Sequence, residues 1–435
     1  MPRGLALLTV LALGLLAACA PTNQVGTVAP EKLDRAIDRA RADLVRRPND
    51  AGALRDLGAL LAQAERFDDA AQYLRQAYVE DRDDPKTLYY LGLLNEAEGD
   101  PGEALQFYGR FEDISPRSAF RPLLKGRYES LVREQIEQEM GSLAAREDSL
   151  ATAEASPQTV AVFPFAYRGS DLRYAPLGRG LGEMVQADLA GIGGLQVVER
   201  LRLQSLLDEL SLSQSEAFNP ATTPRVGRLL RAGRAVGGSF DVEDRDLRID
   251  AALWNWAVQP TPNLQSRSDN LNDLFQLKRE VVLALVEQMG VPLTAEERAM
   301  FDAVPTRNLQ AFLLYSRGLE EEDAGNFAAA TGLFREAVKL DPSFERAADA
   351  SARADAVDKA GGSIQNGLAA ARSLENFGGI DLVGSRLGKL NDSIGSAFIP
   401  GTGGGRDDPS GEAAAATSTF EPLPLPPSPP PPGGN

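Results

Sequence analysis

Small and apolar positions near the N-terminus recur with a fixed spacing. Gly58 and Gly92 lie 34 residues apart. Two further series have the same interval: Ala36, Ala70 and Ala104, and Ala40, Leu74 and Tyr108. A repeat of this length is typical of stacked pairs of antiparallel helices, in which small residues let the helices approach and larger ones fill the seam. The pattern therefore predicts helical hairpins over residues 31–120.

The same spacing returns in the C-terminal half. Gly318 and Pro342 are 24 residues apart, as are Gly92 and Pro116. We predict a further hairpin and a capping helix over residues 300–360, with a tight turn at Gly325-Asn326-Phe327. Because a single hairpin cannot bury its own apolar face, we expect this one to pack on flanking helices or on the middle of the chain.

Residues 157–295 have a different pattern, in which strands alternate with helices. The continuous apolar run 159–165 predicts a strand that is buried on both faces, whereas 247–253 alternates like a half-exposed strand. We expect further strands at 195–198 and 234–242, a hairpin turn at 243–245, a polar loop at 259–273, and helices at 177–189, 201–210, 226–231 and 274–289. The predicted fold class is α/β plus all-α repeats: a mixed-sheet α/β domain flanked by helical hairpins, with residues 121–156 as a helical linker.

Both ends of the chain are expected to lie outside these domains. Residues 4–16 are apolar but shorter than the roughly 20 residues that a membrane helix needs, which favours a signal peptide over residues 1–18 and a polar tether over 19–30. Residues 361–400 are Gly-rich, with short helices expected at 366–374 and 380–394. Residues 401–435 are predicted to form an extended, disordered Pro-rich tail.

Cys19 is the only cysteine in the chain and follows Leu16-Ala17-Ala18. This sequence resembles the lipobox of bacterial lipoproteins. The resemblance implies cleavage before Cys19 and acylation of that residue. Because Ala20 follows Cys19 in place of aspartate, it also implies anchoring in the outer membrane, facing the periplasm. A plain secretory signal is the alternative.

The 34-residue period resembles the tetratricopeptide repeat. That resemblance implies that the first helix of each hairpin lines a groove that binds peptides or proteins. The groove residues it indicates are Arg55, Gln63, Lys86, Tyr89, Leu93 and Glu96. For each of them, a solvated position or a contact between repeats is the alternative.

The middle segment resembles the CsgG/HfaB family and the related TolB amino-terminal domain. Its motifs Val160-Ala161-Val162-Phe163-Pro164-Phe165, Val197-Val198-Glu199-Arg200 and Ala235-Val236-Gly237-Gly238-Ser239-Phe240 occur in the family's order. The resemblance implies a homo-oligomer formed through the α/β domain. It also gives an alternative function, a subunit of an outer-membrane secretion channel. The sequence between 157 and 295 shows no insert long enough for membrane-crossing hairpins, which favours a scaffold over a channel.

Composition removes several kinds of chemistry. The chain has no histidine, so catalytic triads and histidine-bound metals are excluded. Its 45 Lys and Arg against 62 Asp and Glu give a net charge of −17, which argues against nucleic acid as a partner. The glycines at 178, 180 and 182 do not fit a dinucleotide-binding motif, because residue 183 is Glu, and favour a tight turn with close packing. We expect no enzyme activity, no metal and no cofactor.

Acidic clusters are interpreted as solvated surface. Asp241, Glu243, Asp244, Asp246 and Asp250 crowd the predicted hairpin, but Asp246 stands where a calcium loop needs glycine. Residues 320–323 are four consecutive acids and are expected on an exposed helical face, with general acid/base chemistry in a hydrolase as the alternative. Trp254 and Trp256 are expected in the core or at a subunit contact. The leading hypothesis is a non-enzymatic, lipid-anchored scaffold for outer-membrane assembly or export.

Overall fold

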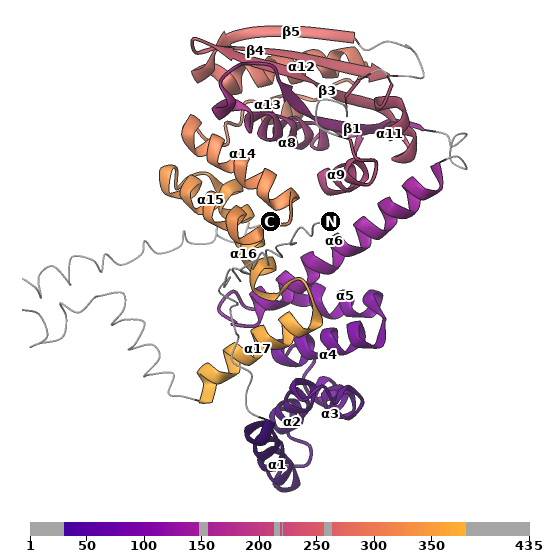
Figure 1. Cartoon of the computed structure of the whole chain (residues 1–435), viewed down its shortest axis with the longest axis vertical. Coiled ribbons are helices and arrows are strands. Elements are labelled where there is room, and N and C mark those ends of the chain that lie inside the picture. Colours follow the sequence, from indigo (N-terminus) through magenta and orange to yellow (C-terminus); the bar gives the residue numbers. More distant parts are fainter. Residues whose placement is uncertain (1–29, 148–154, 213–217, 220, 256–262, 380–435) are drawn as a thin grey trace, which may run out of the picture. The chain divides into compact units, whose positions relative to one another are not determined.

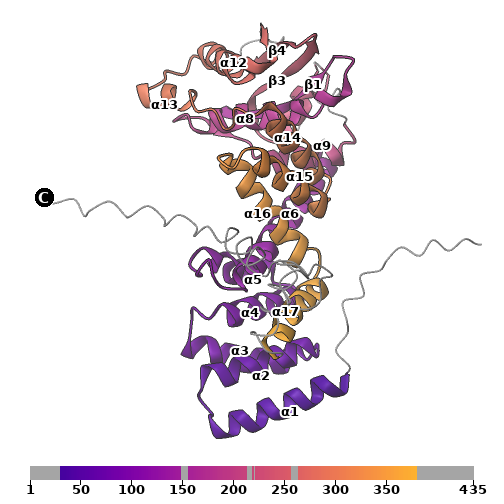
Figure 2. The same ribbon diagram turned by 90° about the vertical axis from the view of Figure 1, so that its left-hand side faces the viewer.

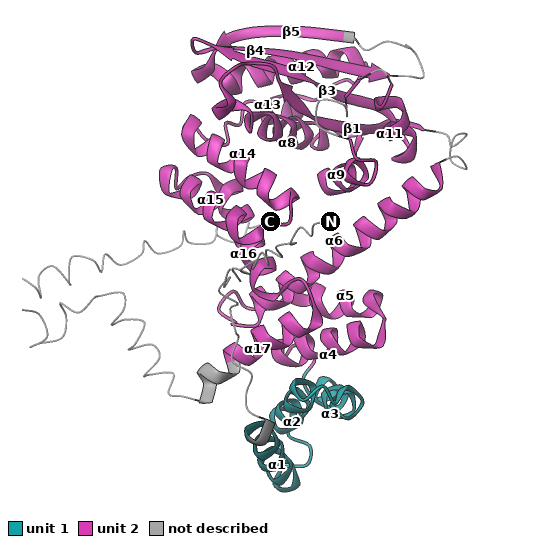
Figure 3. Ribbon diagram, in the orientation of Figure 1, with its two compact units in different colours: residues 1–81 teal, residues 82–435 magenta. Residues whose placement is uncertain are grey.

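A computed structural model describes residues 30–147, 155–212, 218–219, 221–255 and 263–379 (Figure 1). The chain divides into two compact units, residues 1–81 and 82–435 (Figure 3), and each is described by itself. Among the described residues, no helix combines the length and apolar character needed to cross a bilayer. Several predicted features lie outside the described ranges: the signal peptide, Cys19, the tether, Trp256, the helix at 380–394 and the tail.

The first unit contains α1 (Pro30–Arg46), α2 (Ala51–Gln63) and α3 (Phe67–Glu80). Asp50 starts α2 by accepting a hydrogen bond of 2.8 Å from the Ala53 amide, which satisfies a donor at the helix terminus. The two helices of the α2–α3 hairpin approach closely at Gly58, where an added Cβ would lie 2.5 Å from the buried Leu74 side chain. The turn between them holds Glu65 in the left-handed region, with φ of 58°.

The second unit begins with a hairpin of the same design, α4 (Pro85–Glu98) and α5 (Pro101–Gly109). Gly92 faces the Tyr108 ring as Gly58 faces Leu74. Gly99, with φ of 79°, ends α4 in the left-handed conformation that glycine adopts at low cost. A short 3-10 helix, η1 (Arg110–Glu112), leads to the long α6 (Arg121–Ala145), which lies within the predicted helical linker.

The described residues form a mixed sheet of five strands, in the order β2-β1-β3-β4-β5 (Figure 1). The strand β1 runs parallel to β2 and β3, and the other pairs are antiparallel. A two-residue turn joins β3 to β4, with Asp244 and Arg245 both at positive φ, as a type I′ hairpin turn requires. The strand bounds are β1 Ser156–Tyr167, β2 Gln196–Val197, β3 Ala232–Glu243, β4 Asp246–Asn255 and β5 Asn263–Asn270.

The predicted polar loop at 259–273 is wrong, because it contains β5. This strand pairs with β4 along its whole length, from Leu253 opposite Asn263 to Asp246 opposite Asn270. Its side chains are mostly polar, and Leu264 is 67% exposed. As the edge strand of the sheet, β5 is held by backbone hydrogen bonds to β4 and by contact with α12. Because this pairing does not require apolar side chains, the sequence of β5 shows little alternation of apolar and polar residues.

Helices cover both faces of the sheet. The helices α8 (Leu177–Ala190) and α12 (Leu274–Met289) share one core with the sheet, and α9 (Arg200–Glu209) and α11 (Thr223–Leu229) share the other. Along β1, Val160 and Val162 belong to the first core, whereas Ala161 and Phe163 belong to the second. The prediction of a strand buried on both faces is therefore confirmed. Ile136 and Met140 of α6 join the second core.

The C-terminal helices pack onto the rest of the second unit (Figure 2). Gly318 of α14 faces Phe334 of α15 in the hairpin, α14 meets α8 at Gly180, and α16 meets α6 at Gly126. The late hairpin thus packs both on the α/β domain and on a flanking helix. The bounds of these helices are α13 Ala295–Met300, α14 Leu309–Asp323, α15 Phe327–Leu340, α16 Glu345–Ala360 and α17 Ile364–Gly379.

Candidate functional site

The predicted groove residues fall in both units. In the first unit, Arg55 and Gln63 lie on α2. Arg55 is half-buried and pairs with the neighbouring Asp56 at 3.0 Å. Gln63 is 6% exposed. Of the two predicted groove residues in this unit, only Arg55 is therefore accessible to a partner.

In the second unit, the predicted groove residues Lys86, Tyr89, Leu93 and Glu96 lie on α4, and the helix α17 of the same chain covers part of this face (Figures 1 and 2). The Tyr89 hydroxyl donates a hydrogen bond of 2.9 Å to the carbonyl oxygen of Gly367. An added Cβ on Gly367 would lie 2.8 Å from a methyl group of Leu93. Tyr89 and Leu93 are fully buried, whereas Lys86 is half-buried. We call the part of α4 and α6 beneath α17, formed by Tyr89, Leu93 and Arg127, the α17 seat.

Glu96 ties three helices together. Its carboxylate pairs with Arg127 of α6, which is 1% exposed, and accepts a hydrogen bond of 2.5 Å from the Tyr108 hydroxyl of α5. Burial would lower the pKa of Arg127, but the Glu96 carboxylate outweighs it and the pKa is raised. Burial raises the pKa of Tyr108 well above its ordinary value, so the phenol stays a donor. The Glu96 carboxylate therefore fixes the position of Arg127, which forms part of the α17 seat.

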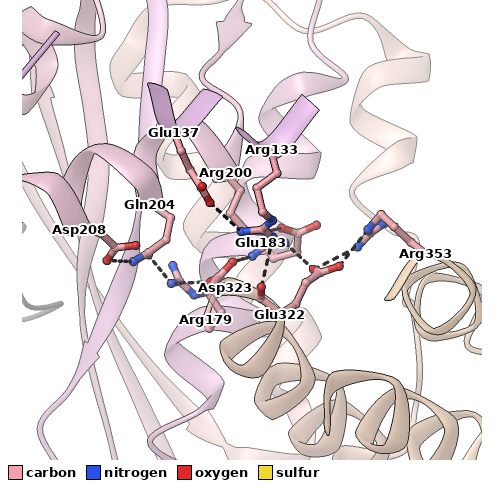
Figure 4. Close-up of polar contacts among 10 residues, drawn as sticks. All are labelled: Arg133, Glu137, Arg179, Glu183, Arg200, Gln204, Asp208, Glu322, Asp323 and Arg353. Carbon is pink, nitrogen blue, oxygen red and sulfur yellow. Dashed lines mark hydrogen bonds and ion pairs between the residues drawn. The ribbon is translucent and has the colours of Figure 1, made fainter. Parts of the chain in front are cut away.

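A cluster of ion pairs lies between the α/β domain and the C-terminal helices (Figure 4). Glu322 and Asp323, at the end of α14, form ion pairs with arginines of three other helices. Arg179 of α8 lies 2.5 Å from Asp323. Arg200 of α9 contacts both acids, at 2.7 Å from Glu322, and also reaches Glu183 at 3.3 Å. Arg353 of α16 donates to Glu322 at 3.0 Å.

The predicted exposed face for the acidic run 320–323 is wrong, because Glu320 and Glu321 are half-buried and the last two side chains are buried more deeply. The side chains of Glu322 and Asp323 are 4% and 5% exposed. Burial would raise the pKa of Glu322, but Arg353 and Arg200 outweigh it and the net shift is downward. Burial and the nearby Arg200 lower the pKa of Arg179 to about 10, so it remains charged at neutral pH. The buried charges therefore neutralise one another, as expected for ion pairs that hold α14 against the neighbouring helices.

Other residues extend this cluster. Arg179 donates to Gln204, and Gln204 donates to Asp208 at 2.7 Å (Figure 4). Arg133 of α6 donates to the backbone carbonyl of Glu322 at 3.2 Å. The cluster thus joins α6, α8, α9, α14 and α16. Sequence reasoning missed it, because its arginines are spread over four helices.

The remaining candidate motifs have structural roles. Gly178 and Gly182 lie inside α8 and not in a turn, where they let the helix approach the backbone of β1. The prediction of close packing is confirmed, and that of a tight turn is wrong. Trp254 is 3% exposed in the second core of the sheet. Among the described residues, no group of three or more Asp, Glu, Cys or His side chains is placed to hold a metal ion.

Comparison with known proteins gives little to transfer. No family model matches the sequence, and no curated protein matches it. One similar solved structure is the LpoB C-terminal domain from Salmonella enterica, at 14% identity, covering 30% of this chain and 95% of that chain, with a TM-score of 0.23. A likeness at this TM-score gives no basis for assigning a function. The resemblances to the tetratricopeptide and CsgG/HfaB families stay predictions.

Proposed function

We propose that the chain is a lipid-anchored scaffold on the periplasmic side of the outer membrane. It binds other proteins through the first helices of its tetratricopeptide-like hairpins and catalyses no reaction. The lipobox-like sequence at Cys19 supports the anchor. The 34-residue period supports the repeats, and the close glycine contacts at Gly58 and Gly92 are what such a period requires of paired helices.

The observation that carries protein binding is the position of α17 on α4. The α17 seat offers the apolar surface of Leu93 and the hydrogen-bond donor of Tyr89 to a helix that presents small residues. Over residues 364–374, the part of α17 whose burial is described, Gly367, Leu368 and Ala371 are buried. Laying one face of a helix into a groove is a common mode of peptide recognition. The face predicted to bind a partner is therefore one that accepts a helix.

A peptide supplied from outside tests this proposal. In the full chain, Gly367→Trp should expel α17, because even a Cβ at this position lies against Leu93 and Tyr89. A fluorescent peptide of residues 361–379 should then bind the variant at least about tenfold more tightly than the wild type, whose seat is filled by a tethered helix. The same peptide carrying Gly367→Trp is the control and should bind neither chain. Equal binding of the unmodified peptide to both chains would overturn the proposal.

A second experiment addresses the scaffold role itself. Proteins crosslinked in membranes to the whole chain, and not to a chain lacking residues 31–120, should be identified by mass spectrometry. The Gly367→Trp variant should increase the yield of partners that use the α17 seat. If the deletion removes no crosslinked protein, the repeats are not the binding region.

A further inference from the structure

A pocket of about 850 Å³ lies at the other end of the second unit, away from the α17 seat. It is formed by the start of α14, the start of α12 and the segment after β1 that contains the 3-10 helix η2 (Leu172–Tyr174). Its floor is apolar and only partly buried, which leaves surface for a ligand: Phe275, Leu309, Leu313 and Leu314. At its edge, Leu172 is 75% exposed.

The charge of the pocket is opposite to that of the chain. The described residues that line it include Arg173, Arg307 and Arg317, and no Asp or Glu. Arg173 pairs with the nearby Asp171 at 2.6 Å. Arg307 and Arg317 form no ion pair with any carboxylate in the described ranges. Three arginines around an apolar floor are unusual for a chain with a net charge of −17.

We propose that this arginine-rimmed pocket binds an acidic peptide segment of a partner protein, with Leu- or Phe-type side chains as its anchors. The leucines of α14 and Phe275 would take the apolar side chains, because partly exposed apolar surface in a concavity of this size is typical of ligand sites. Arg307 and Arg317 would pair with Asp or Glu on either side of the anchors, since neither guanidinium group is engaged in an ion pair with a described carboxylate, although Glu320 lies near Arg317. This site is separate from the α17 seat. Part of it lies on α14, the first helix of the late hairpin, so it rests in that respect on the proposed function; the deletion of residues 31–120 leaves all of its lining residues in the chain.

An unbiased selection tests the proposal. The full chain, purified in mild detergent, is used to select from a random peptide library displayed on phage. The same selection is run on the double variant Arg307→Glu/Arg317→Glu and on Arg298→Glu, which changes an exposed arginine of α13 outside the pocket lining. Circular dichroism of all three chains verifies folding.

The selected peptides should combine Asp or Glu with Leu or Phe. By fluorescence anisotropy, they should bind the double variant at least about tenfold more weakly than the wild type. Their affinity for the Arg298→Glu variant should equal their affinity for the wild type. Raising the salt concentration should weaken binding to the wild type. Selection of peptides without acidic residues, or binding that the double variant retains, would overturn the proposal. Arginine-dependent binding to anionic lipid vesicles without any peptide enrichment would replace it with a lipid site.

Discussion

Tyr89 and Gly367 are 278 residues apart in the chain, yet the Tyr89 hydroxyl donates a hydrogen bond of 2.9 Å to the Gly367 carbonyl oxygen. Burial raises the pKa of Tyr89 above its ordinary value, so the phenol is protonated and able to donate at neutral pH. The contact joins the last described helix to a helix of the first hairpin in the second unit. Whatever displaces α17 must break this bond and uncover Leu93.

The variant Tyr89→Phe should loosen α17 without removing the packing of the ring. A hydrogen bond of this kind contributes about 1 kcal/mol, which corresponds to a roughly fivefold larger equilibrium constant for opening of α17. Hydrogen exchange measured by mass spectrometry over residues 364–374 should report it. Tyr128→Phe, in a half-buried tyrosine of α6 that contacts Phe111, is the matched control and should leave α17 exchange unchanged. Unaltered exchange in Tyr89→Phe would mean that the hydroxyl contributes nothing to holding α17.

The turns of the hairpins give a prediction about stability. Glu65 has φ of 58° at the position where the other hairpins have Gly99 and Gly325, with φ of 79° and 77°. A residue with a Cβ costs about 1 kcal/mol or more in the left-handed region, and glycine avoids this cost. Part of the gain is offset, because glycine raises the conformational entropy of the unfolded chain. Glu65→Gly should therefore slow hydrogen exchange in α2 and α3, with a gain of about 0.5–1 kcal/mol. Gly325→Ala should have the opposite effect on α14 and α15.

The hairpins were predictable because their determinants are local. A glycine on the first helix faces a large residue 16 positions later in each case: Gly58 and Leu74, Gly92 and Tyr108, Gly318 and Phe334. That interval is visible in the sequence. The apolar strand β1 was predictable for the same reason, since its alternate residues fill two cores and leave a continuous hydrophobic run.

The features that sequence reasoning missed depend on distant partners. The strand β5 is polar and is defined by its pairing with β4, which the pattern of its own residues does not show. Four consecutive acids predict a surface position for Glu322, and its burial depends on ion pairs with Arg200 and Arg353, which are distant in the sequence. The burial of Tyr89 depends on a helix that begins at Ile364, in a Gly-rich segment with only weak helical signals. In each case the deciding neighbour is far along the chain or gives no periodic signal.

The buried ion pairs predict a large effect from a single truncation. Glu322→Ala leaves Arg200 and Arg353 without one carboxylate in a site where the Glu322 side chain is 4% exposed, so the free energy of unfolding at pH 7.5 should fall by about 3–5 kcal/mol. Urea unfolding monitored by circular dichroism measures it. Glu139→Ala, which breaks the pair with Arg202 whose side chains are 48% and 33% exposed, is the control and should cost less than about 1 kcal/mol.

The same substitution should have a pH-dependent effect with a defined sign. The folded-state pKa of Glu322 is below its ordinary value, so its contribution is fully present above about pH 4.5 and is lost as the pH falls through the lower, folded value. The difference in the free energy of unfolding between wild type and Glu322→Ala should therefore become smaller as the pH is lowered from 7.5 to about 3. Measurements should avoid the region near the isoelectric point of about 4.7, where the chain carries little net charge. A difference that stays constant would mean that the carboxylate is not held ionised by its arginines.

The lipid anchor can be tested through Cys19 and its neighbour. Because each buried methylene of an acyl chain contributes about 0.8 kcal/mol, several chains on one residue should hold the wild type in the membrane fraction through washes with salt and carbonate. Cys19→Ser removes the attachment point and should release the chain, or leave an uncleaved precursor. Globomycin, which inhibits the lipoprotein signal peptidase, should make the wild-type precursor accumulate and leave Cys19→Ser unaffected. On a density gradient, Ala20→Asp should shift the protein toward the inner membrane if Ala20 directs sorting. A wild-type chain that fractionates with soluble proteins whether or not globomycin is present would contradict the anchor, and with it the membrane location of the proposed scaffold.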